Sequence, residues 1–180
     1  MKSNRRLRYG YGLLCAMAFL PLPALAQPPA TAPSPALGPR YLVAQVPRPS
    51  NSDTTRALAA AVEYAEQKGV SISCAVVDGR GDLVGFTRMD SADFKTRRIA
   101  EAKTLTSAQL GIPSGDAARS GALFDGLNAL MQNTMLAVRG AVPIIRNNEV
   151  IGAIGCSGAP GPGDVDEAAA TAGLAAMSLH

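Results

Sequence analysis

Two segments of the chain alternate apolar and polar residues, turn sharply, and return as a second strand-like run. The turn residues are Asp78-Gly-Arg-Gly81 in the first segment and Asn147-Asn148 in the second. Gly and Asn tolerate the positive φ angles of tight turns, and tight turns join strands that pair antiparallel. The expected strands are 70–77, 82–89, 141–146 and 149–155. The chain is therefore expected to fold around an antiparallel sheet.

Helical periodicity fills the segments around these hairpins. The expected helices run from Ser52 or Asp53 to a stop at Gly69, from Phe94 to Leu110 with Ser91 or Asp93 as the cap, from Leu123 to Gln132, and from Asp164 to about Ser178. The third helix carries an apolar face made of Leu123, Leu127, Leu130 and Met131. This order predicts an α+β fold, in which helices flank an antiparallel sheet of four to five strands. Oligomerisation is one way to cover the open edges of such a sheet.

The first 26 residues have the layout of a secretory signal peptide. A basic head is followed by an apolar stretch over about 11–20, and Ala24-Leu25-Ala26 is the expected cleavage site. The apolar stretch is shorter than the roughly 20 residues that a membrane anchor needs, so the anchor is the less favoured alternative. Removing residues 1–26 changes the net charge from +3 to −1, which argues against a nucleic-acid partner. The mature protein is expected to be periplasmic or secreted, without a membrane span.

Residues 27–50 are rich in proline and read as a flexible linker, which leaves 51–180 as the folded domain. This domain contains two cysteines, Cys74 and Cys156. Export would permit a disulfide between them. Each cysteine lies in an apolar strand-like run, however, where a free thiol commonly serves as a small buried apolar group. The buried-thiol interpretation is favoured.

The residue types restrict the chemistry that the domain can perform. The single histidine is the terminal His180, so no histidine-based metal site or general base is expected in the body of the domain. No dedicated metal site is predicted. A serine-hydrolase motif is also absent. Ser157 and Gly158 lie in a glycine-rich loop before the last helix. The simpler interpretation of this loop is a plain turn, and the alternative is a position beside a ligand.

Charged residues near the first hairpin are the stronger candidates for ligand binding. Arg88 and Asp90 end the return strand, and Arg98 and Lys103 follow on the next helix. One interpretation is a solvated helix face with a structural ion pair to Glu101 or Asp90. The other is a cationic pocket for a carboxylate-bearing ligand, since arginine binds carboxylates in a bidentate geometry.

Several short patterns, taken in order, resemble the GlcG/HbpS-like family over nearly all of 53–180. They are Ile72-x-x-Ala75-Val-Val-Asp, Gly81-x-Leu83-Val-x-Phe86-x-Arg88-Met-Asp90, Ile99-Ala-x-x-Lys103, Val142-Pro-Ile144, Val150-Ile-Gly-Ala-Ile-Gly155-x-Ser-Gly158 and Asp164-x-Asp-x-x-x-Ala170-x-x-Gly173. The resemblance implies a profilin-like fold, homo-oligomers from dimer to octamer, and haem binding, in some members with haem degradation. The chain departs from the family pattern in two places: its domain has no internal histidine, and the usual Gly-Gly-Val-Pro is Gly140-Ala-Val-Pro143.

Three functions follow from these observations. The first is an exported haem- or tetrapyrrole-binding protein, in which Arg88, Arg98 or Lys103 meets the propionates and the iron ligand is Thr, Tyr, Met or water. The second is a protein or enzyme that binds a small carboxylate such as a 2-hydroxy acid. The third is a non-catalytic structural or sensing module. The sequence assigns no catalytic residue and leaves enzymatic activity open.

Overall fold

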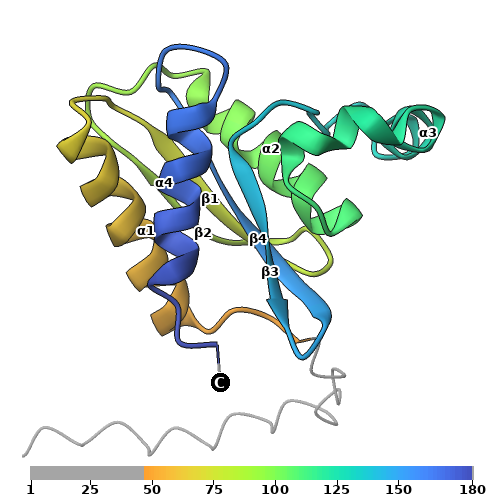
Figure 1. The fold of residues 1–180 in the computed structure, drawn as a ribbon, viewed down its shortest axis with the longest axis horizontal. Coiled ribbons are helices and arrows are strands. Elements are labelled where there is room, and N and C mark those ends of the chain that lie inside the picture. Colours follow the sequence, from red (N-terminus) through yellow and green to blue (C-terminus); the bar gives the residue numbers. More distant parts are fainter. Residues whose placement is uncertain (1–46, 180) are drawn as a thin grey trace, which may run out of the picture. The chain divides into compact units, whose positions relative to one another are not determined.

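The computed structural model describes residues 47–179, all within one compact unit, Val43–His180 (Figure 1). The predicted signal peptide 1–26 lies outside the described residues, as does most of the predicted linker. The helices are α1 (Asn51–Gln67), α2 (Thr96–Leu110), the 3-10 helix η1 (Ser114–Ser120), α3 (Ala122–Leu130) and α4 (Asp164–Ala175), and the strands are β1 (Ser73–Asp78), β2 (Leu83–Arg88), β3 (Ala141–Arg146) and β4 (Glu149–Ser157).

The four strands form one antiparallel sheet in the order β2-β1-β4-β3. Each predicted hairpin supplies one edge strand and one central strand, because β1 pairs with β2, and β3 pairs with β4. Helices α1 and α4 pack side by side on one face, and α2 packs on the other (Figure 1). The predicted α+β fold, with an antiparallel sheet flanked by helices, is confirmed.

Small residues let α1 and α4 pack closely on the sheet. Ala57, Ala61 and Ala65 recur every four residues along α1, and all three are fully buried. On α4, a Cβ added at Gly173 would lie 2.7 Å from the carbonyl oxygen of Ala57. Ile72, Val76, Ile144, Ile151 and Ile154 supply the larger buried side chains of this core. The apolar residues of the sequence pattern therefore form a buried core between the sheet and the helices α1 and α4.

The preference for free cysteines is wrong. Cys74 on β1 and Cys156 on β4 face each other in the sheet register, with Cα atoms 4.1 Å apart, and they form a disulfide. The bond lies in the fully buried core beneath α1 and α4. The sequence could not show this pairing, because it depends on which strands become neighbours in the sheet.

The described chain is packed before the predicted start of the domain. Pro49 is fully buried, and a Cβ added at Gly152 would lie 3.2 Å from its ring. The hydroxyl of Ser50 accepts a hydrogen bond from the Asp53 amide at 3.0 Å and caps α1. Pro49 and Ser50 therefore belong to the folded domain rather than to a flexible linker, and the predicted caps Ser52 and Asp53 lie inside α1.

Two other helix starts also differ from the prediction. Neither Ser91 nor Asp93 caps α2: the helix begins after Lys95, without a side-chain cap, and the Asp93 carboxylate accepts the Lys95 amide just before it. Helix α4 begins after Gly163 at φ 100°, so Asp164 lies within its first turn. Gly111 ends α2 in the left-handed conformation, as the sequence predicts.

Helix α3 shows the largest difference between the expected and observed packing. None of its nine residues is buried, although the sequence predicts an apolar face over this segment. The helix contacts η1 and extends away from the sheet (Figure 1). Leu123 and Leu130 are 61% and 80% exposed. Its apolar face therefore contributes little to the core of this chain.

No helix within residues 47–179 combines the length and the apolar character that crossing a bilayer would require.

Candidate functional site

Arg88 and Asp90 line a shallow hollow of about 390 Å³ at the end of β2. The rest of its lining comes from α1, β2 and the neighbouring loops: Val62, Glu66, Ser71, Thr87, Met89 and Ser91. In the sheet register, Ser73 pairs with Arg88 on one side and with Ser157 on the other. The strand end that carries Arg88 and the glycine-rich loop therefore lie at the same end of the sheet. This hollow, however, is formed with α1 residues and not with Ser157 or Gly158.

Lys103 lies in the interior of the protein. Its Nζ donates to Asp166 Oδ2 at 2.9 Å, and the two side chains are 3% and 4% exposed. Nζ also lies 3.4 Å from the carbonyl oxygen of Cys156. A Cβ added at Gly140 would come within 2.7 Å of Nζ, so this glycine leaves the space through which the lysine passes. Lys103 joins α2 to α4 and is not exposed to a ligand.

Ser157 and Gly158 lie beside this ion pair. Ser157 is the buried last residue of β4, and Gly158 follows at φ +141°. A side chain at Gly158 would collide with the carbonyl oxygen of Ser71, 2.5 Å from the added Cβ. The Ala159 amide then donates to Asp166 Oδ1 at 3.0 Å. These contacts show how the loop is held in place, and they leave a ligand-binding role for Ser157 and Gly158 as a prediction.

Arg139 pairs with acidic side chains at the start of α4, directly after the same loop. Sequence reasoning did not single out this residue. Its guanidinium donates to Asp164 at 2.6 Å and to Glu167 at 2.8 Å, both on the first turn of α4. The hydrogen bond to Glu167 raises the pKa of Arg139 above its ordinary value, and the charge of Asp164 adds to the effect. The negative charges of Asp164 and Glu167 on the first turn of α4 are thus paired with an arginine of the same chain.

A second hollow, which we call the α2 groove, has about 550 Å³ and lies between α2, the first hairpin and the loop after α3. It is lined by Val77, Gly81, Leu83, Arg97, Arg98, Glu101, Ala102, Leu105, Asn133 and Thr134. This volume is within the range of small-molecule sites. Aliphatic side chains from the hairpin and α2 form much of the lining, and the two arginines stand on the first turn of α2.

The two arginines of the α2 groove have different surroundings. Arg97 donates to Glu101 at 2.8 Å and stacks over the Phe86 ring, 5.4 Å from its centre. The hydrogen bond to Glu101 raises the pKa of Arg97 above its ordinary value. The carboxylate of Glu101 therefore offsets much of the Arg97 charge. The exposed Arg98 side chain is the groove cation better placed to meet a ligand anion.

The six residues predicted to bind a ligand therefore fall into three places. Arg88 and Asp90 share the hollow at the end of β2, Arg98 lines the α2 groove, and Lys103, Ser157 and Gly158 lie together beside the sheet end. Sequence reasoning missed the groove itself. Its lining comes from 77–83, 97–105 and 133–134, and no local pattern indicates that these segments meet.

The donor set of the α2 groove can be compared with the needs of haem. A haem presents a flat apolar ring, two carboxylates and an iron that takes axial ligands. The groove offers aliphatic side chains and two guanidiniums, together with the Glu101 carboxylate, the Asn133 amide and the hydroxyl of Thr134. Residues 47–179 contain no histidine, and they hold no cluster of three or more His, Cys, Asp or Glu side chains that could bind a bare metal ion. The aliphatic side chains and the guanidiniums suit the ring and the carboxylates of haem, and the hydroxyl of Thr134 is an oxygen donor that would hold the iron.

Comparisons with known proteins identify the family to which this chain belongs. The model of the family described as haem-degrading protein HbpS-like matches residues 50–175, so the chain belongs to the HbpS-like family. The chain is 30% identical to a double mutant of Streptomyces reticuli HbpS, with a TM-score of 0.67 over 80% of this chain and 97% of that one. The Klebsiella pneumoniae protein ORFY is 27% identical, with a TM-score of 0.64 over 73% and 91% of the two chains.

A third similar structure is a complex with heme. PduOC, determined as a complex with heme, is 26% identical to this chain, with a TM-score of 0.65 over 74% of this chain and 97% of that one. No curated protein sequence matches the chain. The family membership and the fold thus rest on the family model and on solved structures.

Proposed function

We propose that this protein binds haem or a related tetrapyrrole in the α2 groove. The observation that carries the proposal is the combination of aliphatic lining and arginines in one hollow of ligand size. Membership of the HbpS-like family and the likeness to a heme-bound structure support the same ligand class. The aliphatic side chains would contact the ring, and Arg98 would bind a propionate.

Thr134 is the groove residue best suited to face the iron, directly or through water. The lining of the groove includes neither a methionine nor a tyrosine, which leaves hydroxyl oxygen and water from the predicted ligand types. The hydroxyl of Thr134 donates to the carbonyl oxygen of Met131 at 2.6 Å, so the lone pairs of the hydroxyl oxygen stay free to accept. When bound, the iron would supply the redox chemistry, and the chain would position the ring.

Titration of hemin into the full chain tests the proposal. The expected result is a saturable shift of the Soret band with a defined stoichiometry. A Thr134→Val variant is expected to move the band position and to retain binding, because it removes the oxygen and keeps the volume. A titration in which the spectrum stays that of free hemin would overturn the proposal.

Haem degradation is tested in the same preparation. The family description names this activity, and it needs an electron donor and oxygen from outside the chain. With ascorbate in air, a degrading protein bleaches the bound Soret band faster than free hemin is bleached. Equal bleaching rates for bound and free hemin would exclude degradation and leave haem binding as the proposed function.

The hollow at the end of β2 favours the alternative of a small carboxylate ligand. It is smaller than the α2 groove, and Arg88 lines it. Thermal stabilisation by glycolate or lactate that is lost in Arg88→Ala would support this function. Lys103→Ala is unsuitable for this test, because Lys103 is buried in an ion pair.

We also propose export through cleavage of residues 1–26, on the basis of their basic head, apolar stretch and small-residue cleavage site. The protein recovered from a bacterial periplasm or culture medium is expected to begin at Gln27 when its N-terminus is sequenced. An intact Met1 on the protein in both fractions would contradict cleavage.

A further inference from the structure

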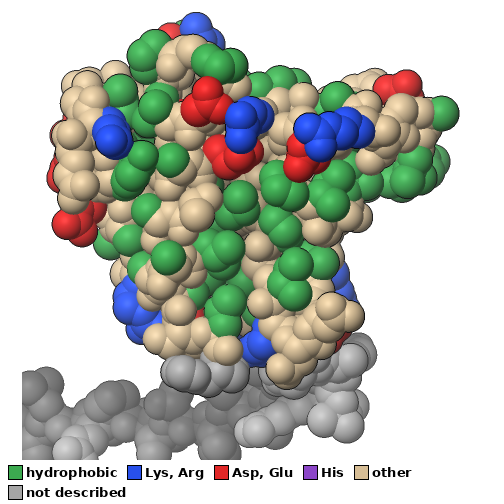
Figure 2. Space-filling model, in the orientation of Figure 1, with side chains coloured by type: hydrophobic (Ala, Val, Ile, Leu, Met, Phe, Trp, Pro, Cys, Tyr) green, Lys and Arg blue, Asp and Glu red, His purple; other side chains and the backbone are tan. Residues whose placement is uncertain are grey.

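One wall of the α2 groove is a turn that directly follows helix α3. Residues 131–136 form this turn, and Asn133 and Thr134 within it line the groove. Helix α3 itself has no buried residue, and η1 is the element that it mainly contacts. Figure 2 shows the helix standing out from the body of the protein. Because the turn starts from this helix, the contacts at the end of α3 decide where the wall lies.

The turn contains two consecutive residues in the left-handed conformation. Gln132 and Asn133 have φ angles of 55° and 59°. The Asn133 amide donates to the carbonyl oxygen of Asn128 at 2.7 Å, and the Gln132 amide donates to that of Ala129 at 3.1 Å. This is the Schellman pattern of a helix end, in which glycine usually occupies the first left-handed position. A glutamine is unfavourable there because of its Cβ, so the surrounding contacts must hold the turn in place.

The side chain of Asn128 supplies such a contact. Its Oδ1 accepts a hydrogen bond from the Met135 amide at 2.9 Å. Asn128 therefore holds the turn at two points, through its carbonyl oxygen and through its side chain. The next amide, that of Leu136, donates to the hydroxyl of Thr106 on α2 at 2.8 Å. Thr134 directly precedes these two fixed amides, so its place in the groove depends on both hydrogen bonds.

We propose that Asn128 is a positioning residue for the α2 groove. Its side chain holds the turn so that Thr134 stays at the edge of the groove, and the protruding helix α3 serves to carry it there. Removing a side chain that orients a metal ligand without touching the metal typically weakens affinity by about 10- to 100-fold. The consequence for hemin rests on the proposed function, whereas the hold on the turn does not.

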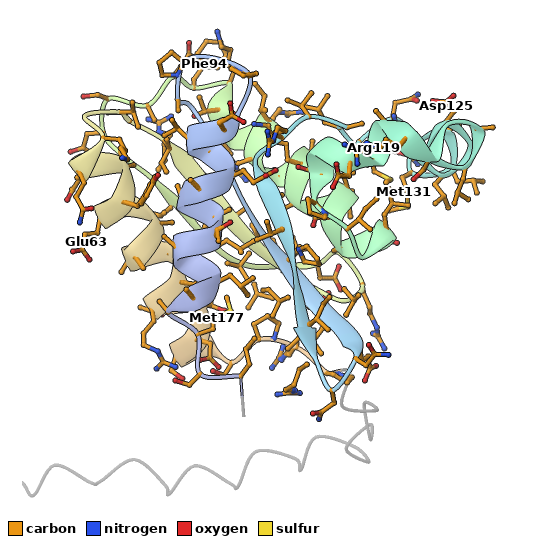
Figure 3. All side chains as sticks on the ribbon, in the orientation of Figure 1. Glu63, Phe94, Arg119, Asp125, Met131 and Met177 are labelled. Atoms are coloured by element: carbon orange, nitrogen blue, oxygen red, sulfur yellow. A yellow bond between two sulfur atoms is a disulfide. The ribbon has the colours of Figure 1, made fainter. Side chains whose placement is uncertain are left out.

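Hydrogen exchange on the full chain without hemin tests the hold on the turn. Asn128→Ala removes the acceptor of the Met135 amide, so the peptide spanning 133–136 is expected to exchange about 5- to 10-fold faster than in the parent. Asn128→Asp keeps an acceptor oxygen and is expected to restore slow exchange. Asp125→Ala is the matched control, because Asp125 is exposed on the side of α3 opposite Met131, where the turn begins (Figure 3). Equal exchange in Asn128→Ala and the parent overturns the proposal.

Hemin titration tests the consequence for the groove. Asn128→Ala is expected to bind hemin with a Kd about 10-fold weaker and with a shifted Soret band. Its melting temperature should change little, because α3 contributes no buried residue to the core. Asn128→Asp is expected to restore both the Kd and the band position, which a purely structural role would leave unchanged in either variant.

The two experiments separate this inference from the proposed function. If the parent binds hemin and Asn128→Ala shows the parent's Kd and spectrum, the positioning role is wrong. If the parent itself leaves the hemin spectrum unchanged, the proposed function fails. The exchange rates of 133–136 then decide alone whether Asn128 positions this wall of the groove.

Discussion

Lys103 Nζ lies 2.9 Å from Asp166 Oδ2, and the ion pair joins α2 to α4 past the end of the sheet that separates them. Asp166 also accepts the Ala159 amide, and Lys103 lies close to the Cys156 carbonyl. Both partners are thus held by further polar contacts, as buried charges require. The lysine that the sequence suggested for ligand binding stabilises the contact between layers.

Breaking this ion pair on one side is expected to destabilise the fold strongly. Asp166→Ala leaves the Lys103 charge buried without its partner, which typically costs about 3–5 kcal/mol. The double variant Lys103→Met/Asp166→Leu removes both charges and is expected to recover part of that loss. Urea denaturation measures each free energy of unfolding. Arg119→Ala, which breaks the exposed Arg119–Asp116 pair, is expected to change stability by less than about 0.5 kcal/mol. A similarly small effect of Asp166→Ala would contradict the structural role.

The disulfide is expected to be a major contribution to stability. Cys74 and Cys156 are 82 residues apart in sequence, and closing a loop of this length in the unfolded chain is worth about 4.5 kcal/mol. Cys74→Ala/Cys156→Ala should therefore lower the free energy of unfolding by roughly 2–5 kcal/mol, measured by urea denaturation. Thiol titration of the unfolded, unreduced Cys15→Ser chain gives a direct check. Two free thiols per chain would restore the buried-thiol interpretation.

Asp53 is expected to make stability depend on acidic pH. Hydrogen bonds from Ser50 and from the Ser178 amide, followed by the charge of Arg56, lower the pKa of Asp53 below its ordinary value of 3.8. A lowered pKa means that the carboxylate stabilises the fold fully above that ordinary value, and that this contribution is lost as the pH falls through the lower folded-state pKa. Asp53→Asn should flatten this part of the stability profile, measured by denaturation from pH 6 to about pH 2. Parallel profiles for the two proteins would show that Asp53 does not carry the effect.

Arg98 is expected to contribute to the affinity of the α2 groove for hemin. A hydrogen bond to a charged group contributes about 1.5–3 kcal/mol, which corresponds to a roughly 10- to 100-fold weaker Kd in Arg98→Ala. Arg97→Ala should have a smaller effect, because Glu101 already pairs with Arg97. Hemin whose propionates are methyl esters should bind both variants and the parent alike. A normal Kd for hemin in Arg98→Ala would exclude the proposed propionate contact.

The sequence by itself determined the elements whose causes are local. Alternation of apolar and polar residues defined the hairpins, and Asn147 and Asn148 occupy the positive φ angles that the turn requires. Gly111 ends α2 for the same reason. Family-specific patterns spread over 53–180 added the arrangement of these elements, because a whole pattern carries information that no single segment holds.

Tertiary structure alone decided the contacts between residues far apart in sequence. Cys74 meets Cys156 because β1 pairs with β4, a choice of neighbour that the periodicity of either strand leaves open. Lys103 meets Asp166 because Gly140 leaves space at the end of the sheet. The α2 groove assembles from three segments that are separate in sequence. The apolar face of α3 stays exposed because the chain runs from η1 into a helix directed away from the core. Local patterns specify which surfaces are apolar, whereas the packing of distant elements specifies which of those surfaces are covered.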